Sequence, residues 1–277
     1  PLSSAPAEHG HQPCPAQLAA PAGMGQAERG MFDEITPMLF APVDLYCERT
    51  SPDFWAEPVN ALTNLAFIAA AIWGGVTAQR RAEASPAVWL LIGLAGVIGI
   101  GSFLFHSFAQ VWASFADTIP IWTFVALACA ISAVRIGGFR PGRVAIGALI
   151  LIALITVLVA SLPDTGREAP PVLNGSLQYT PAVVALAAFA ALAWWRRSPL
   201  AGWITAALGV FLVSLTARSL DLAVCARFPL GLHWIWHLMN GLLIGIVLQI
   251  VIRARQPDSP PPRPGHSIEG STRSGGR

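Results

Sequence analysis

Seven apolar stretches, each close to the length needed to cross a bilayer, constrain this chain more than any other feature. A transmembrane helix needs about 20 predominantly apolar residues. Only 12% of the residues are charged, about half the share in ordinary globular domains. We therefore predict an all-α polytopic membrane protein, a bundle of seven transmembrane helices near residues 58–78, 86–108, 117–135, 143–162, 180–195, 200–220 and 230–252.

Two segments rich in Pro, Gly and polar residues flank the apolar part, and we expect both to be disordered tails. They cover residues 1–30 and 256–277. The first has neither a basic start nor an apolar core, so it does not resemble a signal peptide. We assign residues 31–255 to one membrane domain.

All 17 basic residues are arginine, and their distribution predicts the orientation of the helices. Positive residues gather in cytoplasmic loops. The loops after the first, third and fifth helices and the segment after the seventh hold most of them: Arg80, Arg81, Arg135, Arg140, Arg143, Arg196, Arg197, Arg253 and Arg255. We therefore expect the N-terminus outside and the C-terminus inside.

The composition also excludes several function classes. Without lysine there is no P-loop lysine and no Schiff base with pyridoxal phosphate or retinal. A net charge of +2 argues against a nucleic-acid partner. The arginine- and alanine-rich composition suggests a GC-rich bacterial genome and so a bacterial inner membrane.

Ionisable side chains in or beside membrane helices are costly and commonly functional. With the predicted orientation, all of those found here fall in the outer half of the bundle, whereas scattered residues would populate both halves. They are Glu48, Glu57, His106, Asp117, Arg218, Asp221, His233 and His237.

The spacing of three histidines predicts a metal site. His233 and His237 are four residues apart and share one helix face, and His106 lies at the same depth on another helix. Three imidazoles leave a fourth position open, the pattern of catalytic rather than structural zinc. Asp117, eleven residues after His106, could accept a proton from a zinc-activated water.

Simpler interpretations exist for each of these residues. A transmembrane histidine is often an interhelical hydrogen-bonding group, and Ser102, in a sequence rich in small residues, could serve close helix packing alone. A seven-helix receptor or sensor with a mainly structural zinc is the principal alternative to an enzyme. A transporter with a proton relay is a third, although we find no inverted repeats or broken helices.

Four blocks of the sequence resemble the alkaline ceramidases and the wider seven-helix hydrolase superfamily that includes the adiponectin and progestin receptors. The CE…AExxN block and the Asp–Cys pair favour the ceramidase branch. The blocks are DLYCERTSPDFWAEPVNALTNLAFI (44–68), GSFLFHSFAQVWASFADTIPI (101–121), LDLAVC (220–225) and GLHWIWHLMNG (231–241).

The resemblance implies roles for individual residues. His106, His233 and His237 would hold zinc, and Ser102 and Asp117 would assist catalysis. Cys47 and Cys225 match a disulfide-bonded pair, which would tie the Glu48 segment over the zinc site beside Asp221, a residue that supports the site without binding the metal.

The resemblance also implies a calcium site that would use Glu48 and Glu57. Here the sequence departs from the family's Asp-Trp-Cys-Glu pattern, because Leu45 and Tyr46 precede Cys47 and Asp44 stands one place earlier. Asp44, Thr50 and Asp53 could supply replacement oxygens. We therefore treat calcium as a second candidate cofactor beside zinc.

These observations predict a zinc-dependent intramembrane amidase. It would hydrolyse the amide bond of ceramide or a related N-acyl lipid to a fatty acid and an amine, with its active site towards the periplasm. The partner is the membrane lipid itself.

Overall fold

The computed structural model describes residues 35–83, 85–161 and 172–254, and within them the regular structure is helical. An isolated antiparallel bridge joins Pro42 to Gln110. The two expected tails, 1–30 and 256–277, lie outside the described residues.

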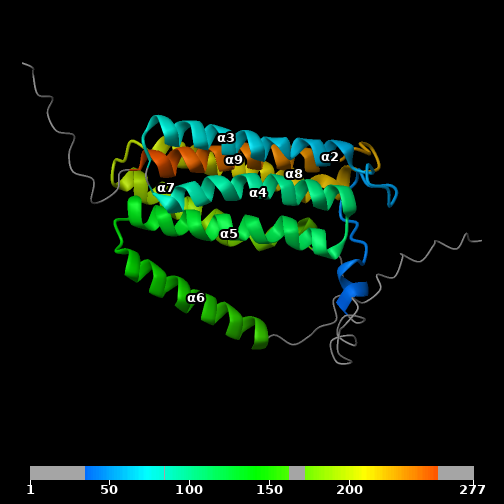
Figure 1. Ribbon diagram of the computed structural model, residues 1–277, viewed down its shortest axis with the longest axis horizontal. Helices are drawn as coiled ribbons and strands as arrows, with labels where there is room; N and C mark the ends of the chain where they lie inside the picture. The colour runs from blue at the N-terminus through cyan, green and yellow to red at the C-terminus, as the bar shows by residue number, and fades with distance from the viewer. Residues whose placement is uncertain (1–34, 84, 162–171, 255–277) are drawn as a thin grey trace, which may run out of the picture.

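Long helices lie side by side along one axis (Figure 1). A 3₁₀ segment, η1 (Val172–Tyr179), leads into α7. The helices are α2 (Pro58–Thr63), α3 (Leu65–Arg80), α4 (Pro86–Phe108), α5 (Val111–Arg135), α6 (Pro141–Ser161), α7 (Thr180–Trp195), α8 (Ala201–Val224) and α9 (His233–Arg253).

The prediction of an all-α membrane protein is confirmed. Six helical segments in the described residues are long and apolar enough to cross a membrane, with α2 and α3 together forming the first. The remaining predicted span corresponds to α6, of which Pro141–Leu154 counts as a shorter apolar helix. The seven-span count and the sidedness of the termini therefore stay predictions.

One predicted helix boundary is wrong. The helix expected near 117–135 begins at Val111, so Asp117 lies inside α5 rather than at its start. The reason is a very tight connection, in which Ala109 caps α4 in the left-handed region (φ 45°) and Gln110 is extended. Glycine usually takes such a position, and no glycine marks this turn.

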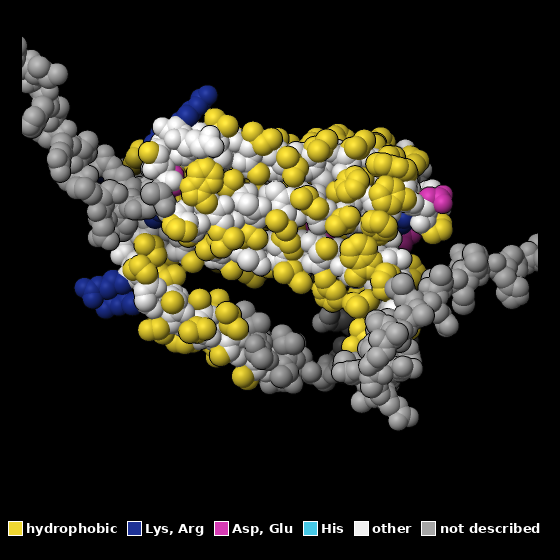
Figure 2. Space-filling view, viewed as in Figure 1, with side chains coloured by type: hydrophobic (Ala, Val, Ile, Leu, Met, Phe, Trp, Pro, Cys, Tyr) yellow, Lys and Arg dark blue, Asp and Glu magenta, His cyan; other side chains and the backbone are white. Residues whose placement is uncertain are grey.

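The surface of the bundle is that of a protein surrounded by lipid. Figure 2 shows hydrophobic side chains along its sides, with charged side chains gathered towards its ends. Large apolar residues such as Leu65, Ile100, Ile119 and Val184 are each more than half exposed. A soluble protein rarely exposes contiguous apolar surface on this scale.

Helix α9 occupies the centre of the bundle. It packs against α3 on one side and α8 on the other, and its residues contribute to both large buried hydrophobic clusters. Leu248 and Val251 are completely buried in the first cluster. This central position carries the two histidines at the start of α9 into the protein interior.

Gly101 allows α4 and α5 to approach closely beside Ser102. A Cβ atom at Gly101 would collide with the carbonyl oxygen of Ala116 and lie 3.2 Å from the backbone nitrogen of Asp117. The obstacle is helix backbone, which cannot rotate away. Gly101 therefore sets the distance between Ser102 on α4 and Asp117 on α5.

We expect Gly101→Ala to lower the free energy of unfolding by about 1–3 kcal/mol, the usual cost of overpacking. Gly96→Ala is the matched control, because a Cβ there meets nothing within 4 Å. Thermal unfolding in detergent measures both. Equal unfolding temperatures for the two variants would contradict the role of Gly101 in helix packing.

Candidate metal centre

Three histidines meet at one end of the bundle, called here the histidine end. His106 comes from the last turn of α4, and His233 and His237 come from the first turns of α9. Each is 1% exposed, and one nitrogen from each ring lies within 4.8 Å of the others. The expected convergence of these three residues is therefore present.

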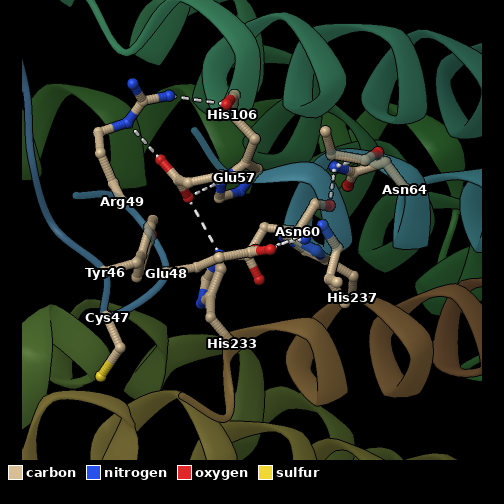
Figure 3. A network of polar contacts seen from close by, with 12 residues as sticks. Tyr46, Cys47, Glu48, Arg49, Glu57, Asn60, Asn64, His106, His233 and His237 are labelled. Atoms are coloured by element: carbon tan, nitrogen blue, oxygen red, sulfur yellow. Dashed lines mark hydrogen bonds and ion pairs between the residues drawn. The ribbon is translucent and has the colours of Figure 1, made fainter. Parts of the chain in front are cut away.

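Glu57 orients His106 (Figure 3). Its Oε2 atom lies 2.6 Å from His106 Nδ1 and accepts a hydrogen bond from Asn60 Nδ2 at 3.0 Å, while its Oε1 accepts from Arg49 Nε at 2.6 Å. Because a carboxylate can only accept, the Nδ1 atom of His106 carries the proton. Nε2 is then free to bind a metal, the arrangement of carboxylate–histidine–metal triads.

The ionised state of Glu57 follows from its neighbours. Burial, the largest influence, raises its pKa, but hydrogen bonds from His106, Asn60 and Arg49 outweigh burial and hold the pKa below its usual value. Arg49 is itself buried and donates through Nη2 to the carbonyl oxygen of His106 at 2.8 Å. The carboxylate is thus fixed in both charge and position.

The other two histidines are also held. His237 Nδ1 lies 2.9 Å from Thr63 Oγ1, and Thr63 Oγ1 donates to the carbonyl oxygens of Val59 and Asn60. The ring of His233 stacks on Tyr46, with centroids 3.5 Å apart and an interplanar angle of 17°. Both rings are therefore positioned before any ligand arrives.

The residues fit a metal ion. His237 Nε2 and His233 Nδ1 are buried ring nitrogens with no hydrogen-bond partner. An unpartnered buried polar atom is costly, whereas a ring nitrogen that faces a metal is satisfied. Three neutral imidazoles at this separation are typical donors for zinc.

A long cavity leads away from the histidines. His233, His237, Ser102 and Asp117 line its polar end. Along α9 the cavity continues to Ile250, about 25 Å away by helical rise, and its deeper walls are mainly apolar, with side chains from α5, α7 and α9. A cavity of this length and polarity suits a long acyl chain.

Ser102 and Asp117 lie together beside the histidines, as expected. Ser102 is 3% exposed, and it lines the polar end of the cavity together with Asp117. The Asp117 Oδ1 atom has no partner. One oxygen of the carboxylate therefore remains available at the polar end of the cavity.

Asp221 joins three segments at the histidine end. Its Oδ1 accepts from the backbone nitrogens of Leu232 and His233 at 2.6 and 2.9 Å, and its Oδ2 from that of Cys47 at 3.1 Å. It thus caps the start of α9 from α8. The Cys47–Cys225 disulfide is also present, linking the same segment to the end of α8.

The side chains expected at a calcium site do not fit calcium. Glu48 Oε1 and Oε2 each accept a backbone N–H at 2.8 Å, from Val59 and Asn60, Glu57 is engaged as described, and Asp44 is exposed. Burial raises the pKa of Glu48 by more than those hydrogen bonds lower it. Calcium requires six to eight oxygen ligands, and here the chain's own donors occupy the carboxylates.

Arg49 supplies a positive charge beside Glu57, where calcium was expected. Besides Glu57, its guanidinium contacts the carbonyl oxygens of Ser51 at 3.1 Å and Asp53 at 3.4 Å through Nη1. The sequence pattern indicates only a calcium-binding role for Glu57 and no role for Arg49. The signal was the adjacent pair Glu48–Arg49, which places an internal cation next to the expected ligands.

Three other residues at the site were not predicted. Thr63 and Asn60 lie on α2, one turn apart, where their side chains reach His237 and Glu57. Tyr46 stacks on His233 from the segment before α2. Asn60 is the last residue of the AExxN block, to which the resemblance gave no role, whereas Thr63 and Tyr46 carry no distinctive sequence signal. Only the fold shows these contacts.

The fold and the site together define a helical integral membrane protein with a buried triad of histidines at the polar end of a lipid-sized cavity. The family model described as Ceramidase matches residues 44–262. The chain therefore belongs to the ceramidase family, whose name denotes hydrolysis of the ceramide amide bond. No curated protein matches the chain significantly.

We expect Glu57→Gln to lower metal affinity about 10–100-fold, because loss of a carboxylate behind a ligating histidine has that typical effect. Titration of the loaded protein with a chelator measures the affinity. Glu83→Gln is the control, since it alters another buried ion pair, with Arg135, on elements away from the histidines. Equal affinities in both variants would contradict the orienting role of Glu57.

Calcium should not stabilise the protein. A ligand at 100 times its Kd raises the free energy of unfolding by about 2.7 kcal/mol, so occupancy would be visible as a higher unfolding temperature. We expect the unfolding temperature to be the same in calcium chloride and magnesium chloride of equal ionic strength. A rise specific to calcium would show that Arg49 can be displaced.

Proposed function

We propose that the protein is a zinc-dependent intramembrane amidase that hydrolyses an N-acyl lipid, ceramide or a related molecule, to a fatty acid and a free amine. The observation that carries the proposal is the position of the histidine triad at the polar end of a long apolar cavity. Family membership supports the reaction class.

His106, His233 and His237 would hold the zinc ion. When bound, zinc supplies Lewis acidity for the amide carbonyl and lowers the pKa of water towards about 7. Two ring nitrogens without partners support this assignment, and three protein ligands leave one position for water or substrate.

Asp117 would transfer the proton. In the proposed reaction its carboxylate takes a proton from the attacking water, whose oxygen bonds to the acyl carbon. The same proton passes to the amide nitrogen as the C–N bond breaks, which gives the acid and the amine. The free Oδ1 atom of Asp117 supports this role, which is that of a general base and then acid.

Ser102 would stabilise the negative charge on the carbonyl oxygen. Its side chain lines the polar end of the cavity beside Asp117, and its hydroxyl would donate to the substrate oxygen. A preorganised donor aimed at developing charge is a common source of catalysis. The buried position beside the cavity supports this assignment over a purely packing role.

The distribution of arginines supports an active site on the periplasmic side. Arg80 and Arg253 end α3 and α9, and Arg135 ends α5. All three helices begin near the histidines and run away from them. Their arginines therefore lie at the opposite end of the bundle. By the positive-inside rule the arginine end would face the cytoplasm.

Asp117→Asn should retain zinc but lose hydrolysis by about 10²–10⁴-fold, because asparagine cannot shuttle a proton. Metal analysis and release of fatty acid from a panel of N-acyl lipids measure the two properties. Asp53→Asn, a change in an exposed loop, is the control and should match the unaltered protein.

Two results would count against this function. Near-normal hydrolysis by Asp117→Asn would make Asp117 a structural partner. Full metal content without hydrolysis of any lipid by the unaltered protein would favour a receptor or sensor with a structural metal.

A further inference from the structure

Arg218 is a buried cation that the proposed reaction does not use. It lies on α8, is 8% exposed, and lines the cavity near the histidines. Its guanidinium remains protonated in proteins. A charge inside a membrane bundle is costly and is by default a sign of function, so its surroundings decide what it can bind.

The immediate partners of Arg218 are aromatic. Its Nη1 donates to Tyr46 Oη at 2.7 Å, and the guanidinium carbon lies 5.6, 5.7 and 5.2 Å from the ring centroids of Tyr46, Tyr179 and Trp236. Such rings attract a cation without neutralising it. None of the three rings supplies a negative charge, so the charge of Arg218 stays in place.

Arg218 also lacks a carboxylate partner. In the described part of the chain no ion pair to Arg218 is present, and its Nε atom is buried without a hydrogen-bond partner. Asp117 lines the same cavity but forms no ion pair with Arg218. The guanidinium therefore has spare donor capacity at the polar end of the cavity.

The position of Arg218 relates it to the scissile bond. Tyr46 stacks on the metal-site residue His233 and accepts the hydrogen bond from Arg218. The ring of Tyr46 thus links Arg218 to His233. A lipid with its amide carbonyl at the histidines and its acyl chain in the apolar part of the cavity would bring the amine part towards Arg218.

We propose that Arg218 binds a single negative charge on the amine part of the substrate. This inference rests on the proposed function and narrows it to N-acyl lipids whose amine part carries a carboxylate or sulfonate, such as N-acyl amino acids. A single arginine faces the cavity among its lining residues, which matches one charge better than a doubly charged phosphate monoester.

The test compares two amides of equal chain length, N-palmitoylglycine and N-palmitoylethanolamine, which differ in one negative charge. Hydrogen bonds between charged groups should favour the glycine conjugate by about 10–100-fold in kcat/KM. Arg218→Met should abolish this ratio, and Arg218→Lys should restore part of it, since lysine keeps the charge without the planar fork.

Arg253→Met is the matched control. Arg253 also stacks on a tryptophan, with its guanidinium carbon 4.6 Å from the Trp203 ring centroid, but it ends α9 at the end opposite the histidines. This variant should keep the ratio of the unaltered protein. A binding measurement with the uncleavable ligands dodecanesulfonate and dodecanol, on the same variants, reports recognition without turnover.

The outcomes separate the two proposals. Equal kcat/KM for both amides, or a ratio unchanged in Arg218→Met, overturns the inference and leaves the amidase standing. If no N-acyl lipid of the panel is cleaved, the proposed function fails and binding decides. Tighter binding of the sulfonate that is lost in Arg218→Met supports an anion site, and equal binding of both ligands overturns it.

Discussion

The architecture of the site depends on one buried carboxylate, that of Glu57. It is 3% exposed, and its two oxygens join the segment before α2, through Arg49, to His106 on α4 and Asn60 on α2. Removal of one member of a buried ion pair leaves an uncompensated charge and costs about 3–5 kcal/mol. The position of a metal-site histidine is therefore coupled to the folding of the loop that covers it.

Asp221 likewise ties the covering segment to the start of α9, on the side of the site that carries His233. By accepting hydrogen bonds from the backbone of His233 and Cys47, it fixes where α9 begins relative to the covering segment. Gly231 lies directly beside this carboxylate, with φ at +66°, and a Cβ atom there would collide with it. The absence of a side chain at Gly231 therefore allows the close approach. The Cys47–Cys225 disulfide adds a covalent link between the same elements.

The meeting of the histidines could be predicted because helix length, arginine distribution and i,i+4 spacing each act along the chain. The contacts that hold them could not. Glu57 and His106 are 49 residues apart, and their pairing depends on how two helices rotate against each other. The sequence pattern indicated no role for Arg49, yet it is buried among carbonyl oxygens beside Glu57. Similarity of residue types suggested calcium ligands, but their partners determine what they bind.

The charges at the histidine end divide into two kinds. Glu57 is neutralised by Arg49, and Asp221 is saturated by backbone N–H groups, so both serve the fold. Asp117 and Arg218 line the cavity without an ion pair between them, and each retains an unpartnered atom. A buried polar atom without a partner is costly, and in the proposed reaction the water and the substrate would supply the missing partners. Their opposite signs fit the two proposed roles, in which Asp117 accepts a proton from the attacking water and Arg218 binds a negative charge on the substrate.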